Sequence, residues 1–363
     1  MSSRRLANLA ARFVGGGGVH VVDPHPDWRP WLADVPRVEA GLAARGLPPR
    51  DIGRLRDDYE LWLDAFTAMQ NGEKEQKALA RSRVEAFLDV LDLPNHLGDV
   101  ADELETDTAS AFLPAGESTL SSLGLLRNIR GALSLSGQPV LALRKLREDL
   151  LGVFSSAHLV SPPCFARAAI LEAMAWEPSS YLSFSDGSPS STQTFLLGHS
   201  LPSLLSLFIR ARFTESQSWP IVLQSAGPSY HNAPSLLIDG RQREKHCVVA
   251  LCRSPEEASA WSTTARDSLL DYLGCTLSLS SMGSRLAGPR SLAHGESSAT
   301  LLHSASFDIA RIGHYGDWLS RRLNLTLHDG SLVHVAYCET DLSRLLALLF
   351  DPATPKKVAD VVR

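Results

Sequence analysis

The first half of the chain carries apolar residues at helical spacing. The best example runs from Asp51 to Asn71, where apolar side chains recur every three or four positions and therefore share one face of a helix. Asp51 can cap the start of this helix, and Asn71 followed by Gly72 can end it. The same periodicity predicts further helices over residues 73–92, 118–134, 138–154 and 163–176. We therefore expect residues 19–178 to form a mainly helical domain.

After residue 194 the pattern changes, and short β-rich runs alternate with helical runs. Candidate strands are residues 195–197, 221–224, 236–238, 247–251, 276–280, 325–327 and 332–337. Candidate helices are residues 201–213, 255–273, 301–312 and 341–350. This alternation predicts a layered domain over residues 195–363. The fold class expected for the chain is α+β or α/β, with a helical N-terminal region followed by a mixed α/β layered domain.

Two segments of biased composition separate these parts. Residues 179–194 are rich in serine, which is typical of a linker. Residues 1–18 form a basic N-terminal segment that ends in four glycines. This segment carries three arginines and no acidic residue, so it resembles an organellar transit peptide; otherwise it is a short helix that docks on the protein. We expect a cytoplasmic protein, with a mitochondrial location as the alternative if residues 1–18 are a transit peptide.

Composition narrows the classes of partner. The net charge of −5 over 363 residues gives no basic surface for a polyanion, so no nucleic-acid partner is expected. The five cysteines are an odd number without close spacing, which indicates reduced thiols in an intracellular protein. No stretch approaches the ~18 apolar residues of a membrane span.

Possible metal and nucleotide motifs do not add up to a site. The candidate metal ligands are His246, Cys247 and Cys252 on one predicted strand, and Asp23, His25 and Asp27 in a proline-rich stretch. On an extended strand His246 and Cys252 lie about 20 Å apart at ~3.3 Å per residue, so they cannot share one ion. The second group can share a face if the chain stays extended, and is otherwise a surface loop. The four glycines before His20 lack the lysine of a phosphate-binding loop. We expect no metal and no cofactor.

One segment has the layout of a nucleophile site. Residues 195–197 predict a strand, Gly198 to Ser200 a sharp turn, and the residues from Leu201 onward a helix. A serine on such a turn is lifted clear of the sheet, and the helix N-terminus offers N–H groups to an oxyanion. The arrangement resembles the nucleophile elbow of the α/β-hydrolase family, with Pro202 where the elbow has its second glycine.

The resemblance implies a catalytic triad in the chain order serine, acid, histidine. Ser200 would be the nucleophile, and the backbone N–H of Leu201 would be one oxyanion donor. Chain order alone nominates Asp239 as the acid and His294 as the histidine. The alternatives that remain open are Glu256 or Glu257 for the acid, and His303 or His314 for the histidine. If Ser200 is instead a helix cap, it needs none of these partners.

The absence of clear metal, nucleotide and dinucleotide motifs favours a protein that acts by protein–protein interaction. Its expected partner is another protein or a second copy of the same chain, and no catalytic activity is identifiable. The alternative function is a serine hydrolase or acyltransferase that uses Ser200.

Overall fold

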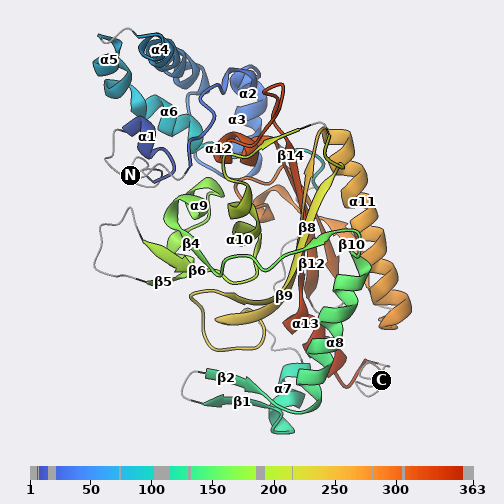
Figure 1. Cartoon of the computed structure of the whole chain (residues 1–363). Coiled ribbons are helices and arrows are strands. Elements are labelled where there is room, and N and C mark those ends of the chain that lie inside the picture. Colours follow the sequence, from blue (N-terminus) through green and yellow to red (C-terminus); the bar gives the residue numbers. More distant parts are fainter. Residues whose placement is uncertain are drawn as a thin grey trace.

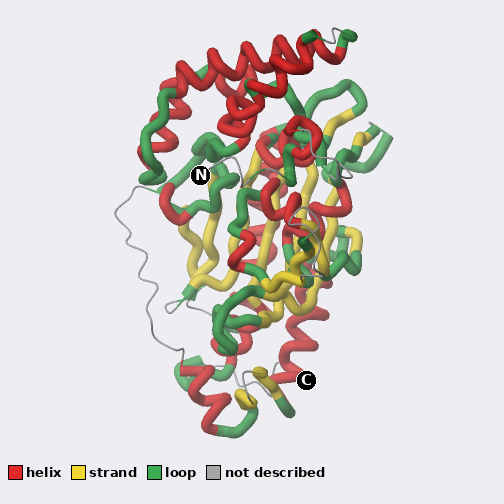
Figure 2. The backbone as a smooth tube through the Cα atoms, turned by 90° about the vertical axis from the view of Figure 1, so that its left-hand side faces the viewer, coloured by secondary structure: helices red, strands yellow, loops and turns green. Residues whose placement is uncertain are grey.

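A central β-sheet with helices on both faces organises the molecule (Figure 1). The computed structural model describes residues 6, 8–14, 22–72, 75–101, 115–129, 132–184, 193–214, 216–279, 282–304 and 307–354. A helical unit built from the first hundred residues lies at one end of the sheet, and a small unit of one hairpin and its flanking helices lies at the other end (Figures 1 and 2).

The central sheet has seven strands in the order β10-β11-β12-β14-β9-β8-β3. Its strands are β3 (His158–Leu159), β8 (Ile221–Tyr230), β9 (Gln242–Cys252), β10 (Gly283–Leu286), β11 (Ser298–His303), β12 (Asp308–Gly316) and β14 (His334–Asp341). All neighbouring pairs are antiparallel except β3 and β8, which are parallel. This sheet and its covering helices confirm the predicted mixed α/β fold class.

Alternation along the strands gives the sheet two buried faces. Val248 and Cys338 point into a core shared with α8 (Gln138–Val153), α11 (Pro255–Asp271) and α13 (Leu342–Leu349). Their neighbours Val249 and Tyr337 point into the opposite core. That second core is covered by α9 (Ala168–Ala173), α10 (Leu201–Leu205) and α12 (Trp318–Leu323).

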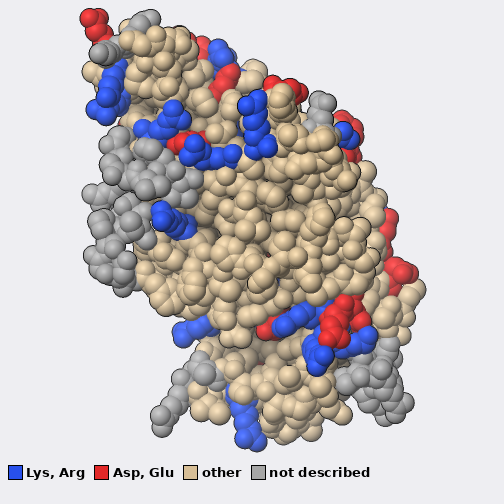
Figure 3. Space-filling view, in the orientation of Figure 1, with Lys and Arg blue, Asp and Glu red and all other residues tan. Residues whose placement is uncertain are grey.

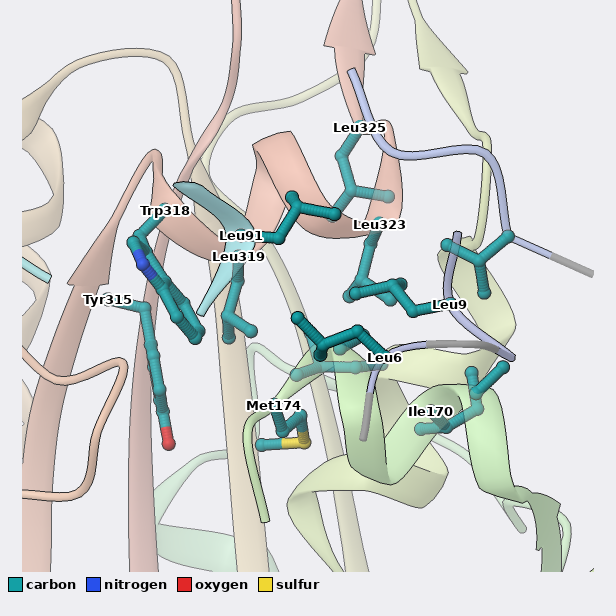
Figure 4. Packing of buried hydrophobic residues seen from close by; sticks show 14 of the residues in the cluster. Leu6, Leu9, Leu91, Ile170, Met174, Tyr315, Trp318, Leu319, Leu323 and Leu325 are labelled. Atoms are coloured by element: carbon teal, nitrogen blue, oxygen red, sulfur yellow. The ribbon is translucent and has the colours of Figure 1, made fainter. Parts of the chain in front are cut away.

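The N-terminal helical unit packs around aromatic side chains. Its helices are α1 (Ala11–Val14), α2 (Arg29–Leu32), α3 (Val35–Ala44), α4 (Ile52–Gln70), α5 (Gln76–Ser82) and α6 (Val84–Leu91). The rings of Trp62 and Phe87 stack at 4.2 Å, and Phe13 meets both. Figure 4 shows how Leu6 and Leu9 join this unit to the second core, where they pack against residues of α9 and α12.

Several predicted elements differ from the observed ones. Residues 118–134, predicted as one helix, contain the end of α7 (Ala115–Ser122) and a hairpin of β1 (Leu126–Ile129) and β2 (Ala132–Leu135). In the segment 301–312, also predicted as a helix, residues 301–303 belong to β11 and residues 308–312 to β12. Residues 236–238 and 276–279 are not strands. The apolar runs in these segments are short, and contacts with other parts of the fold decide their conformation rather than their own periodicity.

A smaller sheet includes parts of the serine-rich segment. It consists of β4 (Phe165–Arg167), β5 (Leu182–Phe184) and β6 (Thr194–Leu196), in the order β4-β6-β5. Of residues 179–194, positions 185–192 lie outside the described ranges, as do the glycines at 15–18. The division of the chain into domains at this segment stays a prediction. Within the described residues, no helix is long and apolar enough to cross a membrane.

Candidate functional site

Charged side chains gather on one face of the central sheet, near the ends of β9 and β14. The register pairs Asp341 on β14 with Lys245 on β9, and Glu339 with Cys247. Because side chains alternate along a strand, Arg243, Lys245, Glu339 and Asp341 all point to the face of the second core. Burying charges in such numbers is costly unless each is paired. The pairing of these charged side chains therefore determines which of them can bind a ligand.

At the edge of this face, two arginines converge on the carboxylate of Asp239, and the buried carboxylate of Asp341 lies 3.5 Å from Nη1 of Arg243 and 3.9 Å from Nε of Arg344. Arg344 donates from Nη2 to both carboxylate oxygens of Asp239, at 2.7 and 2.9 Å, and Arg243 donates from Nη1 to Oδ1 at 3.1 Å. Asp239 lies in the loop between β8 and β9, its side chain is 57% exposed, and its backbone has a left-handed φ of 52°. Arg243 and Arg344 are far less exposed, and we call them the arginine pair.

The end of β14 explains why Arg344 stands where it does. Asp341 is the N-cap of α13, and its Oδ1 accepts the backbone N–H of Arg344 at 3.0 Å. This cap fixes Arg344 in the first turn of the helix. Its Nη1 then donates to the backbone oxygen of Asp308 at 2.6 Å, which orients the guanidinium toward the loop that carries Asp239.

Deeper on the same face, Lys245 and Arg311 each have a carboxylate partner. Lys245 pairs with Glu339, and burial lowers the pKa of the Lys245 ammonium to about 7. The fully buried Glu296 accepts from Arg311 Nε at 2.9 Å and from the hydroxyl of Tyr337. Burial raises the pKa of Tyr337 well above its usual range, so its hydroxyl keeps the proton that it donates. These pairs are closed, whereas the arginine pair meets solvent through Asp239.

Polar atoms without partners lie on the neighbouring strand. Ser225 and Ser229 of β8 are fully buried, and their hydroxyls have no hydrogen-bond partner among the described residues. The register places Ser229 opposite Arg243, whose Nε is also unpartnered. His199 packs closely against Gly227, which lies between the two serines on β8. A Cβ added at Gly227 would be only 2.4 Å from Cδ2 of His199. Unsatisfied buried donors are rare in folded proteins, so this row has polar atoms that can hydrogen-bond a water molecule or a polar ligand.

A cavity of about 690 Å³ lies next to the arginine pair. It is bounded by β2, by α8, by the smaller sheet and by the loop between β8 and β9. Its wall includes Arg241, and also Gln242 and Ser343, which are adjacent in sequence to Arg243 and Arg344. In Figure 3 the surface narrows between the body of the molecule and the lower unit of α7, β1, β2 and α8, and charged side chains gather beside this waist.

The three residues of the predicted triad have separate partners. Ser200 does follow a strand and precede a helix, but it is buried and its hydroxyl lies 3.2 Å from that of Ser203. His294 directs Nε2 to the backbone oxygen of Asp92 at 3.0 Å. Asp239 is held by the arginine pair. No hydrogen bond joins Ser200, His294 and Asp239, so the structure does not bring them together.

The alternative site residues also have local partners. Glu257 provides the backbone N–H that the N-cap of α11 accepts, and Glu256 lies in the same first turn. His303 contacts the neighbouring Ser304 oxygen, and His314 accepts a backbone N–H through its own carbonyl. Within the described ranges, no three His, Cys, Asp or Glu side chains form a group that could hold a metal ion.

Sequence reasoning missed the arginine pair. Asp341 was expected to begin a helix, and its place as the cap of α13 identifies Arg344 as a first-turn residue. The basic residues Arg241, Arg243 and Lys245 alternate along β9 and the residue before it, which was the available signal for a charged strand face. Nothing in the sequence indicated that Asp239, expected to follow a strand, would reach both arginines.

The chain resembles known proteins in its structure and not in its sequence. No family model matches the chain, and no curated protein matches its sequence. The cytoplasmic serine-tRNA ligase of Naegleria fowleri, solved with AMP, superposes with a TM-score of 0.69 at 13% identity over 89% of this chain and 91% of the other. The chain shares the fold of seryl-tRNA synthetases.

Two further solved structures are similar to this chain in fold. Seryl-tRNA synthetase of Pyrococcus horikoshii, complexed with ATP, has a TM-score of 0.60 at 14% identity and covers 96% of this chain and 91% of its own. Prolyl-tRNA synthetase of Giardia lamblia, in complex with prolyl-adenylate, has a TM-score of 0.56 at 10% identity, over 64% of this chain and 50% of the other. At these identities the likeness concerns the fold.

These neighbours correct three predictions. A protein-interaction module without chemistry was wrong, because the fold extending over nine-tenths of the chain is that of aminoacyl-tRNA synthetases. The serine hydrolase or acyltransferase alternative is overturned by the same finding, and with it the basis for a triad at Ser200. The expectation of no nucleic-acid partner is also wrong, since the neighbours are named for their action on tRNA.

Proposed function

We propose that this chain binds an adenine nucleotide at the arginine pair and activates a carboxylate as its adenylate. In that reaction a carboxylate oxygen attacks the α-phosphorus of ATP, the bond to the β-phosphate oxygen breaks, and pyrophosphate leaves. The observation that carries the proposal is the convergence of Arg243 and Arg344 on Asp239, where a carboxylate fills the position of an anion.

The geometry of the pair suits a phosphate. Arg344 donates from Nη2 to both oxygens of one carboxylate, and a guanidinium can donate to phosphate oxygens in the same way. Arg243 approaches from β9, so two donors from different elements would meet one anion. Its unpartnered Nε and the hydroxyls of Ser225 and Ser229 supply further donors for phosphate or ribose oxygens. The neighbours in fold, solved with AMP, ATP or prolyl-adenylate, support an adenine nucleotide as the ligand.

Asp239 must leave the arginine pair when a phosphate enters. Its side chain is 57% exposed and belongs to a loop, so its ion pairs are worth no more than ~1 kcal/mol. A phosphate carries more charge and more acceptor oxygens than a carboxylate. The exchange is therefore favourable, and Asp239 acts as a weak competitor that lowers the apparent affinity for nucleotide.

Titration calorimetry with AMP and ATP tests the site. Arg344→Ala and Arg243→Ala should each weaken binding by roughly 10- to 150-fold, since a hydrogen bond to a charged group contributes ~1.5–3 kcal/mol. Asp239→Asn should tighten it by up to about fivefold. Arg266→Ala serves as the matched control, because Arg266 lies on α11 and pairs with Asp267 on the surface. Folding of each variant is checked by urea unfolding.

The proposal fails if neither wild-type protein nor Asp239→Asn binds AMP or ATP at millimolar concentration. It fails equally if both arginine variants bind as wild type does. Exchange of pyrophosphate into ATP, measured with mixed amino acids and other carboxylic acids, tests the reaction itself. Nucleotide binding without pyrophosphate exchange would support the proposed nucleotide-binding site and overturn the proposed adenylate-forming activity.

The same comparison supports a choice of acceptor and of cellular location to test. Total tRNA is the first acceptor to assay, because the neighbours are named as tRNA ligases and synthetases. A cytoplasmic location is supported by the neighbour from Naegleria fowleri, which is a cytoplasmic ligase. Cell fractionation with an antibody to the chain checks it, and recovery in an organelle fraction with a shortened N-terminus would contradict it.

A further inference from the structure

The cavity beside the arginine pair has features of a ligand site in its own right. Its volume of about 690 Å³ falls within the ~300–1,000 Å³ of small-molecule sites. Its apolar lining comes from four separate parts of the fold: Leu133, Leu135, Val140, Leu143, Leu182, Leu196, Leu236 and Leu237. Such a lining binds hydrocarbon by the hydrophobic effect.

The pattern of α8 separates an apolar part of the cavity from a charged part. Val140 and Leu143 lie on the same helix face as Arg144 and Arg147, because these positions are three, four and seven residues apart. Leu133 and Leu135 alternate on β2 and point the same way. The cavity therefore offers hydrocarbon surface at one end and guanidinium groups at the other.

The charges of the lining favour an anion. Arg144 pairs with Glu148, and Arg147 pairs with Glu244 at 2.5 Å. Arg241 has no carboxylate partner within the described ranges. Its Nε donates to the backbone oxygen of Ala233 at 3.3 Å, which leaves both terminal nitrogens free to bind another group. The buried Nε of Arg147 is also unpartnered there. The cavity thus has an anchor for negative charge in addition to its apolar lining.

We propose that this cavity binds a medium-chain fatty carboxylate, with the acyl chain among the leucines and the carboxylate on Arg241. An unbranched chain fits a lining made of leucine and valine side chains, and a carboxylate fits the two free nitrogens of one guanidinium. The proposal concerns binding alone and requires no nucleotide, so it stands or falls apart from the proposed adenylate-forming activity.

Calorimetry with decanoate, in the absence of nucleotide and below its micelle concentration, tests the proposal. Octanoate should bind about 15-fold more weakly, because each buried methylene contributes roughly fourfold in affinity. Arg241→Ala should weaken decanoate binding at least tenfold. Decanol, which lacks the charge, should bind more weakly than decanoate by a similar factor. Decyl phosphate is included because phosphate and carboxylate share the same anionic chemistry; binding of decyl phosphate without decanoate would overturn the carboxylate assignment.

A cavity-filling variant provides the second arm. Leu143→Trp places a large side chain in the cavity from a half-buried position of α8 and should abolish decanoate binding. Leu207→Trp is its matched control, since Leu207 is exposed and lies outside the cavity lining. Unchanged decanoate binding in both Arg241→Ala and Leu143→Trp would overturn the proposal, and so would absence of binding to the folded wild-type protein.

Discussion

The burial of His246 should make the protein sensitive to acid. The side chain is fully buried on β9, where Nε2 lies 3.1 Å from the side-chain oxygen of Gln224 and Nδ1 has no partner among the described residues. Burial lowers the pKa of His246 to about 3, from an ordinary value of 6.5. The folded protein therefore keeps this imidazole neutral at pH values at which the unfolded chain protonates it.

The size and sign of the effect follow from that difference. The stabilising contribution is complete above pH 6.5 and is lost as the pH falls from 6.5 toward 3, because the unfolded state binds the proton more tightly. At pH 4 the loss amounts to about 3 kcal/mol, at 1.36 kcal/mol per pKa unit. Such a loss is a large fraction of the ~5–15 kcal/mol total stability that is typical of a domain.

Urea unfolding at pH 7, 5 and 4 measures it. Between pH 7 and pH 4, His246→Leu should lose about 3 kcal/mol less stability than the wild type. The variant also leaves the Gln224 oxygen without its donor, but that cost is the same at each pH and cancels in the difference. His328→Leu is the control, since His328 is exposed. If His246→Leu and wild type lose the same stability between pH 7 and pH 4, the reasoning is refuted.

Three further substitutions test the packing around the site. Glu296→Ala leaves the partly exposed Arg311 without its carboxylate and the buried hydroxyl of Tyr337 without its acceptor, and should cost ~1–3 kcal/mol in urea unfolding, where an unchanged stability would contradict the closed pair. Gly198→Ala should cost more than ~1 kcal/mol, because φ is 69° and a Cβ would lie 2.1 Å from the backbone oxygen of Pro228; unchanged thermal unfolding would argue against that close contact. Ser254→Ala removes the N-cap of α11 and should cost ~1 kcal/mol, and no change in the urea midpoint would speak against the cap.

The long amphipathic helices could be predicted from the sequence with good accuracy. The helix predicted from Asp51 to Asn71 is α4, with Asp51 as its N-cap and Asn71 as its C-cap. The helices predicted over 138–154 and 255–273 are α8 and α11. In such segments the periodicity extends over several turns, and in α4 and α11 a capping side chain marks the start. Local sequence is then enough, because the information lies within one element.

The strands of the central sheet were harder to predict, because hydrogen bonds to other strands stabilise each of them and the pattern within one segment does not show those bonds. Residues 301–312 contain apolar positions at helical spacing, yet they form parts of β11 and β12, which pair with each other and with β10 and β14. A fully buried strand reads as a continuous apolar run, and so does a short buried helix. The choice between them is made by hydrogen bonds to other strands.

The same limit applies to the arginine pair. Asp239 is four residues from Arg243 but 105 residues from Arg344. Each residue type suggests a charged surface, and no local pattern joins the three. The register of β9 with β14 and the cap at Asp341 bring them together. Motif reasoning instead favoured Ser200, where the strand, turn and helix are contiguous and therefore visible in one stretch of sequence.

The loop between β8 and β9 links the two proposed binding sites. Asp239 of this loop occupies the arginine pair, while Leu236 and Leu237 form part of the cavity wall. A phosphate that displaces Asp239 must move the loop, and the wall of the cavity moves with it. Binding at either site then changes affinity at the other by the same factor, because linkage between two ligands is reciprocal. The factor by which AMP changes the affinity for decanoate should therefore equal the factor by which decanoate changes the affinity for AMP. Asp239→Asn, whose hold on the loop is weaker, should bring both factors closer to one.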